Sequence, residues 1–274
     1  MEKLIITLAH TGNVPTKEIN EYTPTTTSEI VDSIESCVGL GASVAHIHVR
    51  DSEGKPTSDR ALFESVLNEI KDRNIKCITQ VSTGARGGEN TIDWRGQMLD
   101  LNAHMASLST GSSNFANSVN ANSPELIEAL ANKMKQNDIV PEIEAFDLSM
   151  ISNAVYLQKK GILEGPLHFN LVMNVPGSIK GTAKNLLFMR EALPKDATWN
   201  VTAVSSSQVE LITLAIALGG HVRTGLEDVI YYEKGVIASN QMLIQRVVNI
   251  ANAVGRDIAS PQEAHAILGL KKPL

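Results

Sequence analysis

The segment SEIVDSIESCVGLGASVAHIHVRD, residues 28–51, contains the pattern that decides the fold. Its first part, residues 28–41, has apolar residues at helical spacing, a capping candidate in Thr27 or Ser28, and a glycine at its end. Its second part, residues 44–50, is a run of mostly β-forming residues. The segment therefore predicts an amphipathic helix that leads through a short turn into a strand.

The same alternation continues in both directions along the chain. Short β-type runs lie at residues 4–10, 44–50, 75–83, 104–110, 140–147, 167–173, 198–204 and 220–225. The clearest helical patterns lie at residues 28–41, 60–73, 123–137 and 207–220, and weaker ones at 90–102 and 149–161. Strands that alternate with helices at this spacing indicate an α/β protein with parallel strands and helical crossovers.

Eight such units match the size of a closed (β/α)8 TIM barrel, which takes about 250 residues. The competing architecture, an open doubly wound sheet, normally has a glycine fingerprint after its first strand, and HTGNVPT at residues 10–16 does not fit it. No linker or internal repeat interrupts the chain. We therefore predict a single TIM-barrel catalytic domain over residues 1–274, with a C-terminal helical extension from about Asn240 to Leu268.

Composition and charge exclude several classes of partner. The net charge of −6 gives no basic surface for nucleic acid or an anionic membrane. Cys37 and Cys77 stand in apolar settings without a C-x-x-C partner, so we expect two buried thiols. The N-terminal residues lack a signal-peptide pattern, and no apolar run approaches the roughly 20 residues of a membrane span. These features predict a cytoplasmic protein.

Polar side chains follow every predicted strand, and in a barrel the strand ends of one rim form the functional site. They are His10 and Thr11, His46 and His48, Ser82 and Thr83, Ser109 and Thr110, Glu142, Glu144 and Asp147, Asn170 and Asn174, Ser205 to Ser207, and Arg223, Glu227 and Asp228. Because polar residues follow all eight strands at the same end of the predicted barrel, they predict a pocket there.

His46 and His48 are two positions apart, so their side chains point to the same face of a strand. A hydrogen bond inside the barrel would satisfy each ring, but burying two imidazoles without partners costs about 1–3 kcal/mol each. Two neutral imidazoles suit zinc, and a carboxylate as third ligand would leave an open catalytic position. From the residues alone, Glu227, Asp228 and Glu144 are candidates for that carboxylate.

The segment GGHVRTGLED, residues 219–228, places an arginine just before two adjacent acids. Glu227 and Asp228 would ordinarily be a solvated helix N-terminus, but Arg223 could hold a carboxylate in a bidentate pair. A divalent metal, an arginine and a spare carboxylate together suit an enolate, because the first two stabilise its charge and the third removes the proton.

Two glycine- and hydroxyl-rich segments, QVSTGARGGEN at residues 80–90 and SLSTGSSNF at residues 107–115, follow the third and fourth predicted strands. Each alone is a common turn sequence. Together they could hold a carboxylate or phosphate, which makes Thr83, Gly84, Ser109 and Thr110 candidates for substrate binding.

These motifs occur in one order along the chain. HIHVRD at residues 46–51, the two hydroxyl-rich segments, PEIEAFD at residues 141–147 and GGHVRTGLED follow one another at intervals that resemble those of the β-keto acid cleavage enzymes. The resemblance runs from about residue 1 to 270. It implies a zinc-bearing TIM barrel.

The resemblance also implies roles for individual residues. His46, His48 and Glu227 match the ligands of one zinc ion per chain. Asp228, Arg223 and Ser82 match the group that deprotonates the substrate, with Asp228 as the base. An acid of PEIEAFD belongs to the family site as well; we favour Glu144 over Glu142, although strand alternation puts both on one face.

The family reaction combines a β-keto acid with acetyl-CoA as co-substrate. The substrate carbanion attacks the thioester, CoA migrates, and a retro-Claisen step releases acetoacetate and a new acyl-CoA. The resemblance further implies a homotetramer.

The sequence departs from the family's pattern after the first strand, where TGNVP at residues 11–15 stands in place of a pattern beginning TGA. In family members that cleave 3-keto-5-aminohexanoate, the residue after this TGA is an acid that holds the substrate ammonium. The corresponding residue here is Val14, which would form an apolar wall beside Asn13. We therefore expect uncharged, short apolar or hydroxylated β-keto acids to be preferred over 3-keto-5-aminohexanoate by about 10²-fold. Glu18 or Glu21 could instead fold back to supply the charge.

Two other functions fit parts of the pattern. A zinc-dependent aldolase or an amidohydrolase-type hydrolase on a TIM barrel would need further ligands, whereas His168 and His221 stand at strand starts. The third alternative is not enzymatic: a degenerate barrel whose zinc is structural, or a metabolite-binding protein. Structural zinc usually has four closed ligands rich in cysteine, and Cys37 and Cys77 are badly placed for that. Acetyl-CoA-dependent release of acetoacetate separates the first function from both.

Overall fold

The computed structural model describes residues 1–85, 88–115 and 118–274. Its central feature is a closed barrel of parallel strands in the order β1-β12-β11-β10-β9-β6-β5-β2. The bounds are β1 (Ile6–Ala9), β2 (Val44–Ile47), β5 (Ile78–Val81), β6 (Met105–Ser109), β9 (Val140–Ala145), β10 (His168–Met173), β11 (Thr198–Ala203) and β12 (His221–Thr224). The predicted TIM barrel is confirmed.

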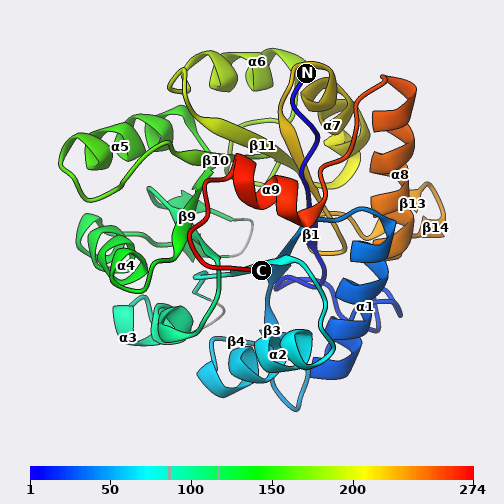
Figure 1. Ribbon diagram of the computed structural model, residues 1–274, viewed down its shortest axis with the longest axis horizontal. Helices are drawn as coiled ribbons and strands as arrows, with labels where there is room; N and C mark the ends of the chain where they lie inside the picture. Colours follow the sequence, from blue (N-terminus) through cyan, green and yellow to red (C-terminus); the bar gives the residue numbers. More distant parts are fainter. Residues whose placement is uncertain (86–87, 116–117) are drawn as a thin grey trace.

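Helices surround these strands as an outer ring (Figure 1). They are α1 (Thr27–Leu40), α2 (Arg60–Asp72), α3 (Ile92–Arg95), α4 (Pro124–Gln136), α5 (Leu148–Lys159), α6 (Ala183–Glu191), α7 (Gln208–Ala217) and α8 (Asn240–Ala253), with short 3-10 turns η1 (Gln97–Asp100) and η2 (Ser205–Ser207). Helix α1 begins with a capping box between Thr26 and Glu29, so its cap is Thr26, before the predicted Thr27 or Ser28.

Alternation along each strand separates the helix-facing core from the barrel interior. In β2, Ala45 and Ile47 pack in the layer between strands and helices, whereas Val44 packs with the residues that fill the barrel floor. His46 shares the face of Val44, so it points into the barrel above that floor.

The predicted second strand is shorter than its sequence pattern. It leaves the barrel after Ile47, and β3 (Val49–Arg50) pairs instead with the antiparallel strand β4 (Pro56–Thr57). Similar hairpins are formed by β7 (Ser113–Asn114) with β8 (Val119–Asn120), and by β13 (Tyr231–Glu233) with β14 (Val236–Ile237). All three follow barrel strands and therefore lie toward the rim that carries the polar strand ends.

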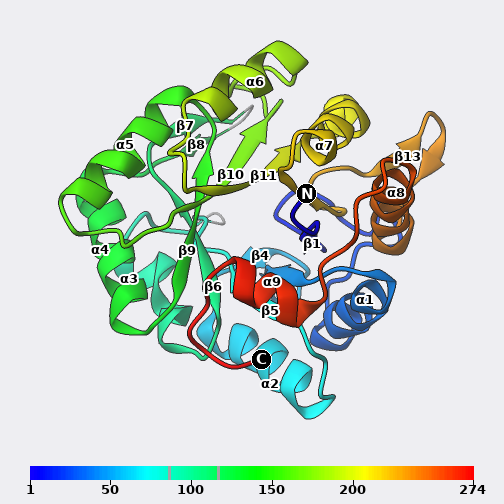
Figure 2. The same ribbon diagram turned by 45° about the horizontal axis from the view of Figure 1, so that its top comes forward.

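The C-terminal region differs from the single helical stretch that the sequence predicted. Helix α8 belongs to the outer ring, and Gly255, with a φ of 71°, follows its end. Helix α9 (Pro261–Ile267) then crosses the opposite end of the barrel, where Ala264 packs with Ile5 and Val44 (Figures 1 and 2). Because α9 covers the floor, the C-terminal strand ends form the open mouth.

No helix within the described parts of the chain is both long enough and apolar enough to cross a membrane.

Candidate active site

His46, His48 and Glu227 converge inside the mouth of the barrel. His46 ends β2 and His48 follows it, and their Nε2 atoms lie 3.2 Å apart. Glu227, from the turn after β12, brings Oε1 to 3.3 Å from His48 Nε2 and Oε2 to 3.8 Å from His46 Nε2. One ligand atom from each residue lies within 4.8 Å of the other two, as a metal ion requires.

The neighbours of the two rings fix which nitrogen is available to a ligand. The Nδ1 atom of His46 lies 2.5 Å from Gln80 Oε1, and that of His48 lies 3.1 Å from Asn13 Oδ1. Each Nδ1–H donates to an amide oxygen, which leaves Nε2 unprotonated and turned toward its partner. Burial, aided by the charge of Arg223, lowers the pKa of His46 to about 3, so that ring is neutral.

The chemistry of this donor set fits a divalent cation. The Nε2 atoms of the two rings face each other, and Glu227 Oε2 is buried without a hydrogen-bond partner among the residues that the structure describes. Three such acceptors repel one another unless a cation lies between them. Two imidazoles and one carboxylate are also a donor set of catalytic zinc sites that keep an open position.

Arg223 is the centre of a charged cluster beside these residues. Its Nη2 lies 2.7 Å from Glu227 Oε1, and its guanidinium donates to both oxygens of Asp228, at 3.0 and 3.2 Å. Its Nη1 reaches Glu144 Oε1 at 3.4 Å. The three carboxylates raise the pKa of Arg223 well above its ordinary value against the effect of burial, so it stays charged.

The carboxylates around Arg223 differ in their affinity for a proton. Burial raises the pKa of Asp228 to about 6 and that of Glu144 to about 7, and the negative charge of Glu227 adds to both increases. The pKa of Glu227 itself is held well below its ordinary value by Arg223 and the two histidines, despite burial. One anionic ligand therefore stands beside acids that are suited to exchange protons near neutral pH.

Comparison of the sequence with known protein families identifies the family of this chain. Residues 3–270 match the family described as beta-keto acid cleavage enzyme. The chain belongs to the β-keto acid cleavage enzyme family. As the resemblance of its motifs predicted, the protein is an enzyme that acts on β-keto acids.

Two relatives of this β-keto acid cleavage enzyme match it over nearly their whole lengths. It is 40% identical over 274 residues to a 3-keto-5-aminohexanoate cleavage enzyme of Fusobacterium nucleatum, covering 99% of this chain and 100% of that one. It is 41% identical over 270 residues to a 3-oxoadipate:acetyl-CoA acetyltransferase of Cupriavidus necator, covering 97% of this chain and 94% of that one.

The apo structure of ObcA shares the fold with a TM-score of 0.79 and 19% identity, and the likeness covers 91% of this chain and 66% of that one.

In this family member, Glu142 and Glu144 occupy different depths of the barrel. Glu144 contacts Arg223 and accepts a hydrogen bond from Ser109 Oγ at 3.3 Å. Glu142 lies lower, 3.0 Å from His168 Nε2 and 2.8 Å from Asn200 Nδ2. Although burial opposes it, the bond to His168 helps hold the pKa of Glu142 at about 2. The geometry thus brings Glu144 to the charged cluster around Arg223 and leaves Glu142 in a layer of polar side chains beneath that cluster.

The predicted substrate-binding hydroxyls have different surroundings. Thr83 Oγ1 donates to the Ser107 carbonyl and Thr110 Oγ1 to the Met150 carbonyl, each at 2.7 Å. Ser82 is buried at the end of β5 and accepts a hydrogen bond from the Gly84 amide at 3.4 Å. The hydroxyls of Thr83 and Thr110 therefore hold the loops in place, and contact of these residues with substrate stays a prediction.

Two parts of the expected pocket stay predictions or lie outside the described residues. Val14 is 76% exposed in the loop that follows β1, and its role as an apolar wall beside a bound substrate stays a prediction. Within the glycine-rich segment after β5, Arg86 and Gly87 lie outside the described residues.

Gln80 and Asn13 are the partners of the histidines that sequence reasoning did not identify. Gln80 is fully buried, and its position two residues before Ser82 on the same strand face is a signal in the sequence. Asn13 gives no comparable signal, because it belongs to a loop.

The histidines that a rival hydrolase would need are held elsewhere. His168 lies 2.7 Å from Thr198 Oγ1 and 3.0 Å from Glu142, and His221 Nδ1 accepts from the Ile5 amide at 3.1 Å. Both begin their strands, at the floor end of the barrel. Neither histidine belongs to the group of His46, His48 and Glu227 that converges at the mouth of the barrel.

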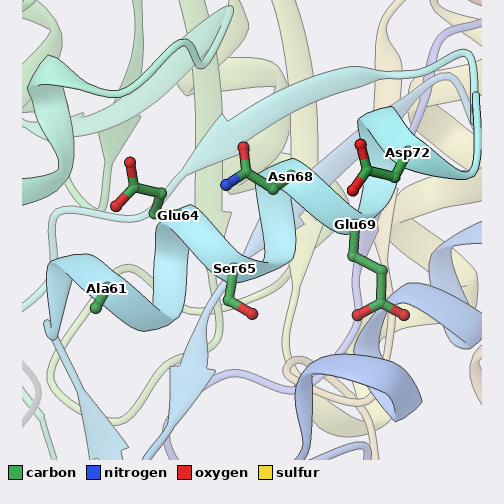
Figure 3. Close-up of a pocket in the computed structure, with 6 residues that line it drawn as sticks. All are labelled: Ala61, Glu64, Ser65, Asn68, Glu69 and Asp72. Carbon is green, nitrogen blue, oxygen red and sulfur yellow. The ribbon is translucent and has the colours of Figure 1, made fainter.

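A shallow depression of about 510 Å³ also follows the outer face of α2 (Figure 3). Its lining side chains are Ala61, Glu64, Ser65, Asn68, Glu69 and Asp72, all from that one helix. It lies on the outside of the ring and lacks the convergence of buried groups found at the mouth.

Proposed function

We propose that this enzyme is zinc-dependent and exchanges acyl groups between a β-keto acid and acetyl-CoA, releasing acetoacetate and a new acyl-CoA. The observation that carries the proposal is the convergence of His46, His48 and Glu227 beside the Arg223–Asp228 pair. The activity for which the 3-oxoadipate:acetyl-CoA acetyltransferase of Cupriavidus necator is named supports acetyl-CoA as the co-substrate. When bound, zinc would hold the keto acid and polarise its ketone, which makes the carbon between ketone and carboxylate acidic.

Asp228 would remove the proton from that carbon. Arg223 donates to both of its oxygens, so the carboxylate is held in one orientation inside the mouth. Its pKa of about 6 suits a base that accepts a proton near neutral pH. Arg223 also offers positive charge to the carbanion that forms. Glu144, beside Arg223 and Ser109, and Ser82 at the end of β5 complete the proposed catalytic group.

The remaining steps balance without a further reagent. The carbanion attacks the thioester carbonyl of acetyl-CoA, a carbon–carbon bond forms, and the CoA thiolate leaves. The thiolate then attacks the carbonyl carbon of the original ketone. The bond between that carbon and the carbon that Asp228 deprotonated breaks. The proton returns to the departing carbanion, so the products are acetoacetate and the acyl-CoA of the original keto acid.

The proposal is tested by incubating zinc-loaded protein with a β-keto acid in the presence and absence of acetyl-CoA. We expect a new acyl-CoA, identified by mass, and acetoacetate only when acetyl-CoA is present. Breakdown of the keto acid at the same rate without acetyl-CoA would favour the zinc-dependent aldolase or hydrolase instead.

The substrate preference gives a second test. Residues 11–15 contain no charged side chain and therefore offer no carboxylate to the ammonium group of an aminated substrate. Lys17, which follows in the β1–α1 connection, pairs with Glu29. A missing charge-assisted hydrogen bond is worth roughly 1.5–3 kcal/mol. Because no side chain of residues 11–15 would pair with an ammonium group, we expect kcat/KM for 3-oxohexanoate to exceed that for 3-keto-5-aminohexanoate by about 10²-fold.

The variant Val14→Glu should shift this preference toward the amine. Equal or reversed kcat/KM values for the two acids in the wild type would show that another group, such as Glu18 or Glu21, supplies the charge.

Residues 1–274 as one catalytic domain, a homotetramer and a cytoplasmic location stay predictions that rest on the sequence and on its resemblance to the family.

A further inference from the structure

The loop of residues 11–15 touches two of the three proposed metal ligands. Asn13 Oδ1 lies 3.1 Å from His48 Nδ1. Gly12 has a φ of +58°, and a Cβ atom there would lie 2.3 Å from Glu227 Cγ. The backbone of the loop therefore packs against Glu227 while its next side chain holds His48.

Arg50 fixes the backbone of this loop. Its Nη2 donates to the carbonyls of Gly12 at 2.7 Å and Pro15 at 2.9 Å, and its Nη1 donates to that of Gly54 at 3.0 Å. Arg50 is 4% exposed and comes two residues after His48, so the motif HIHVRD supplies two proposed ligands and the arginine that holds the loop beside them. The position of Asn13 is thereby fixed although its side chain is exposed.

The two histidines depend on different kinds of acceptor. A neutral imidazole that binds a metal through Nε2 carries its proton on Nδ1, and the partner of that N–H sets the orientation and basicity of the ring. For His46 the partner is Gln80, which is fully buried in the barrel wall. For His48 the partner is Asn13, an exposed residue of a loop at the mouth.

We propose that Asn13 is a positioning residue that sets the affinity of the site for its metal through the ring of His48. The inference rests on the metal site of the proposed function, and it names a determinant of metal binding that neither ligates metal nor carries charge. Asn13 ties the loop that bears Val14 to the metal centre.

The test measures zinc affinity without substrate, by competition with a chromophoric chelator. Asn13→Ala removes the acceptor and should weaken zinc binding about 10- to 100-fold, the usual effect of losing the partner of a ligating histidine. Asn13→Asp keeps an acceptor and should bind zinc at least as tightly as the wild type. The matched control is Asn68→Ala on the exposed face of α2, which should leave zinc affinity unchanged.

A second readout reports the ring itself. In cobalt-substituted protein, the visible absorption bands should change in Asn13→Ala and return toward the wild-type spectrum in Asn13→Asp. Wild-type zinc affinity and an unchanged cobalt spectrum in Asn13→Ala would overturn the inference and leave the proposed function intact. A wild-type protein that binds no zinc would overturn both.

Discussion

Replacing both His46 and His48 by alanine is expected to abolish zinc binding and to reduce turnover to background, while the barrel stays folded. The two rings supply two of three converging ligand atoms, and Glu227 alone would offer a single carboxylate that already pairs with Arg223. The fold should survive because the layer between strands and helices is formed by other side chains, such as Ala45 and Ile47 of the same strand.

Metal content by mass spectrometry, turnover and circular dichroism would be measured on the same sample. The matched control is His265→Ala on α9 at the opposite end of the barrel, which should retain both zinc and activity. Full metal retention in the double variant would contradict the assignment of these ligands.

Asp228→Asn should separate binding from chemistry. The substitution keeps the size of the side chain, and an amide oxygen would still accept a hydrogen bond from Arg223. It removes the proton acceptor, however, so kcat should fall by about 10² or more, as is typical for the loss of a general base. Zinc content and the binding of the keto acid should be preserved.

Asp196→Asn, an exposed aspartate before β11, provides the matched control and should leave kcat unchanged. Loss of zinc together with activity in Asp228→Asn would identify Asp228 as a ligand and would require a new assignment for Glu227.

The barrel strands were predictable because their patterns repeat. Each of the eight predicted runs contains a barrel strand, and residues 60–73 contain α2. The residues at which the strands end were less predictable. VAHIHVR is one β-type run, yet the chain leaves the barrel after Ile47 because β3 pairs with β4. The C-terminal helices divide at Gly255, whose left-handed conformation a helical pattern does not reveal.

The site was predictable where one strand or one turn supplies its residues. His46 and His48 share a strand face, and Arg223 precedes Glu227 and Asp228 by four and five positions. Contacts between elements were not predictable from local patterns. Gln80 meets His46 because β2 and β5 pair in that register, and Glu144 differs from Glu142 only by its height in the barrel.

In the proposed reaction the acetyl group of acetyl-CoA becomes part of acetoacetate, and doubly ¹³C-labelled acetyl-CoA makes this transfer measurable. Zinc-loaded protein would be incubated with the labelled thioester and unlabelled 3-oxohexanoate, 3-oxoadipate or 3-keto-5-aminohexanoate, and the products would be analysed by mass. We expect acetoacetate that carries both labels and a new acyl-CoA that carries none. Unlabelled acetoacetate, or label in the new acyl-CoA, would contradict the proposed reaction.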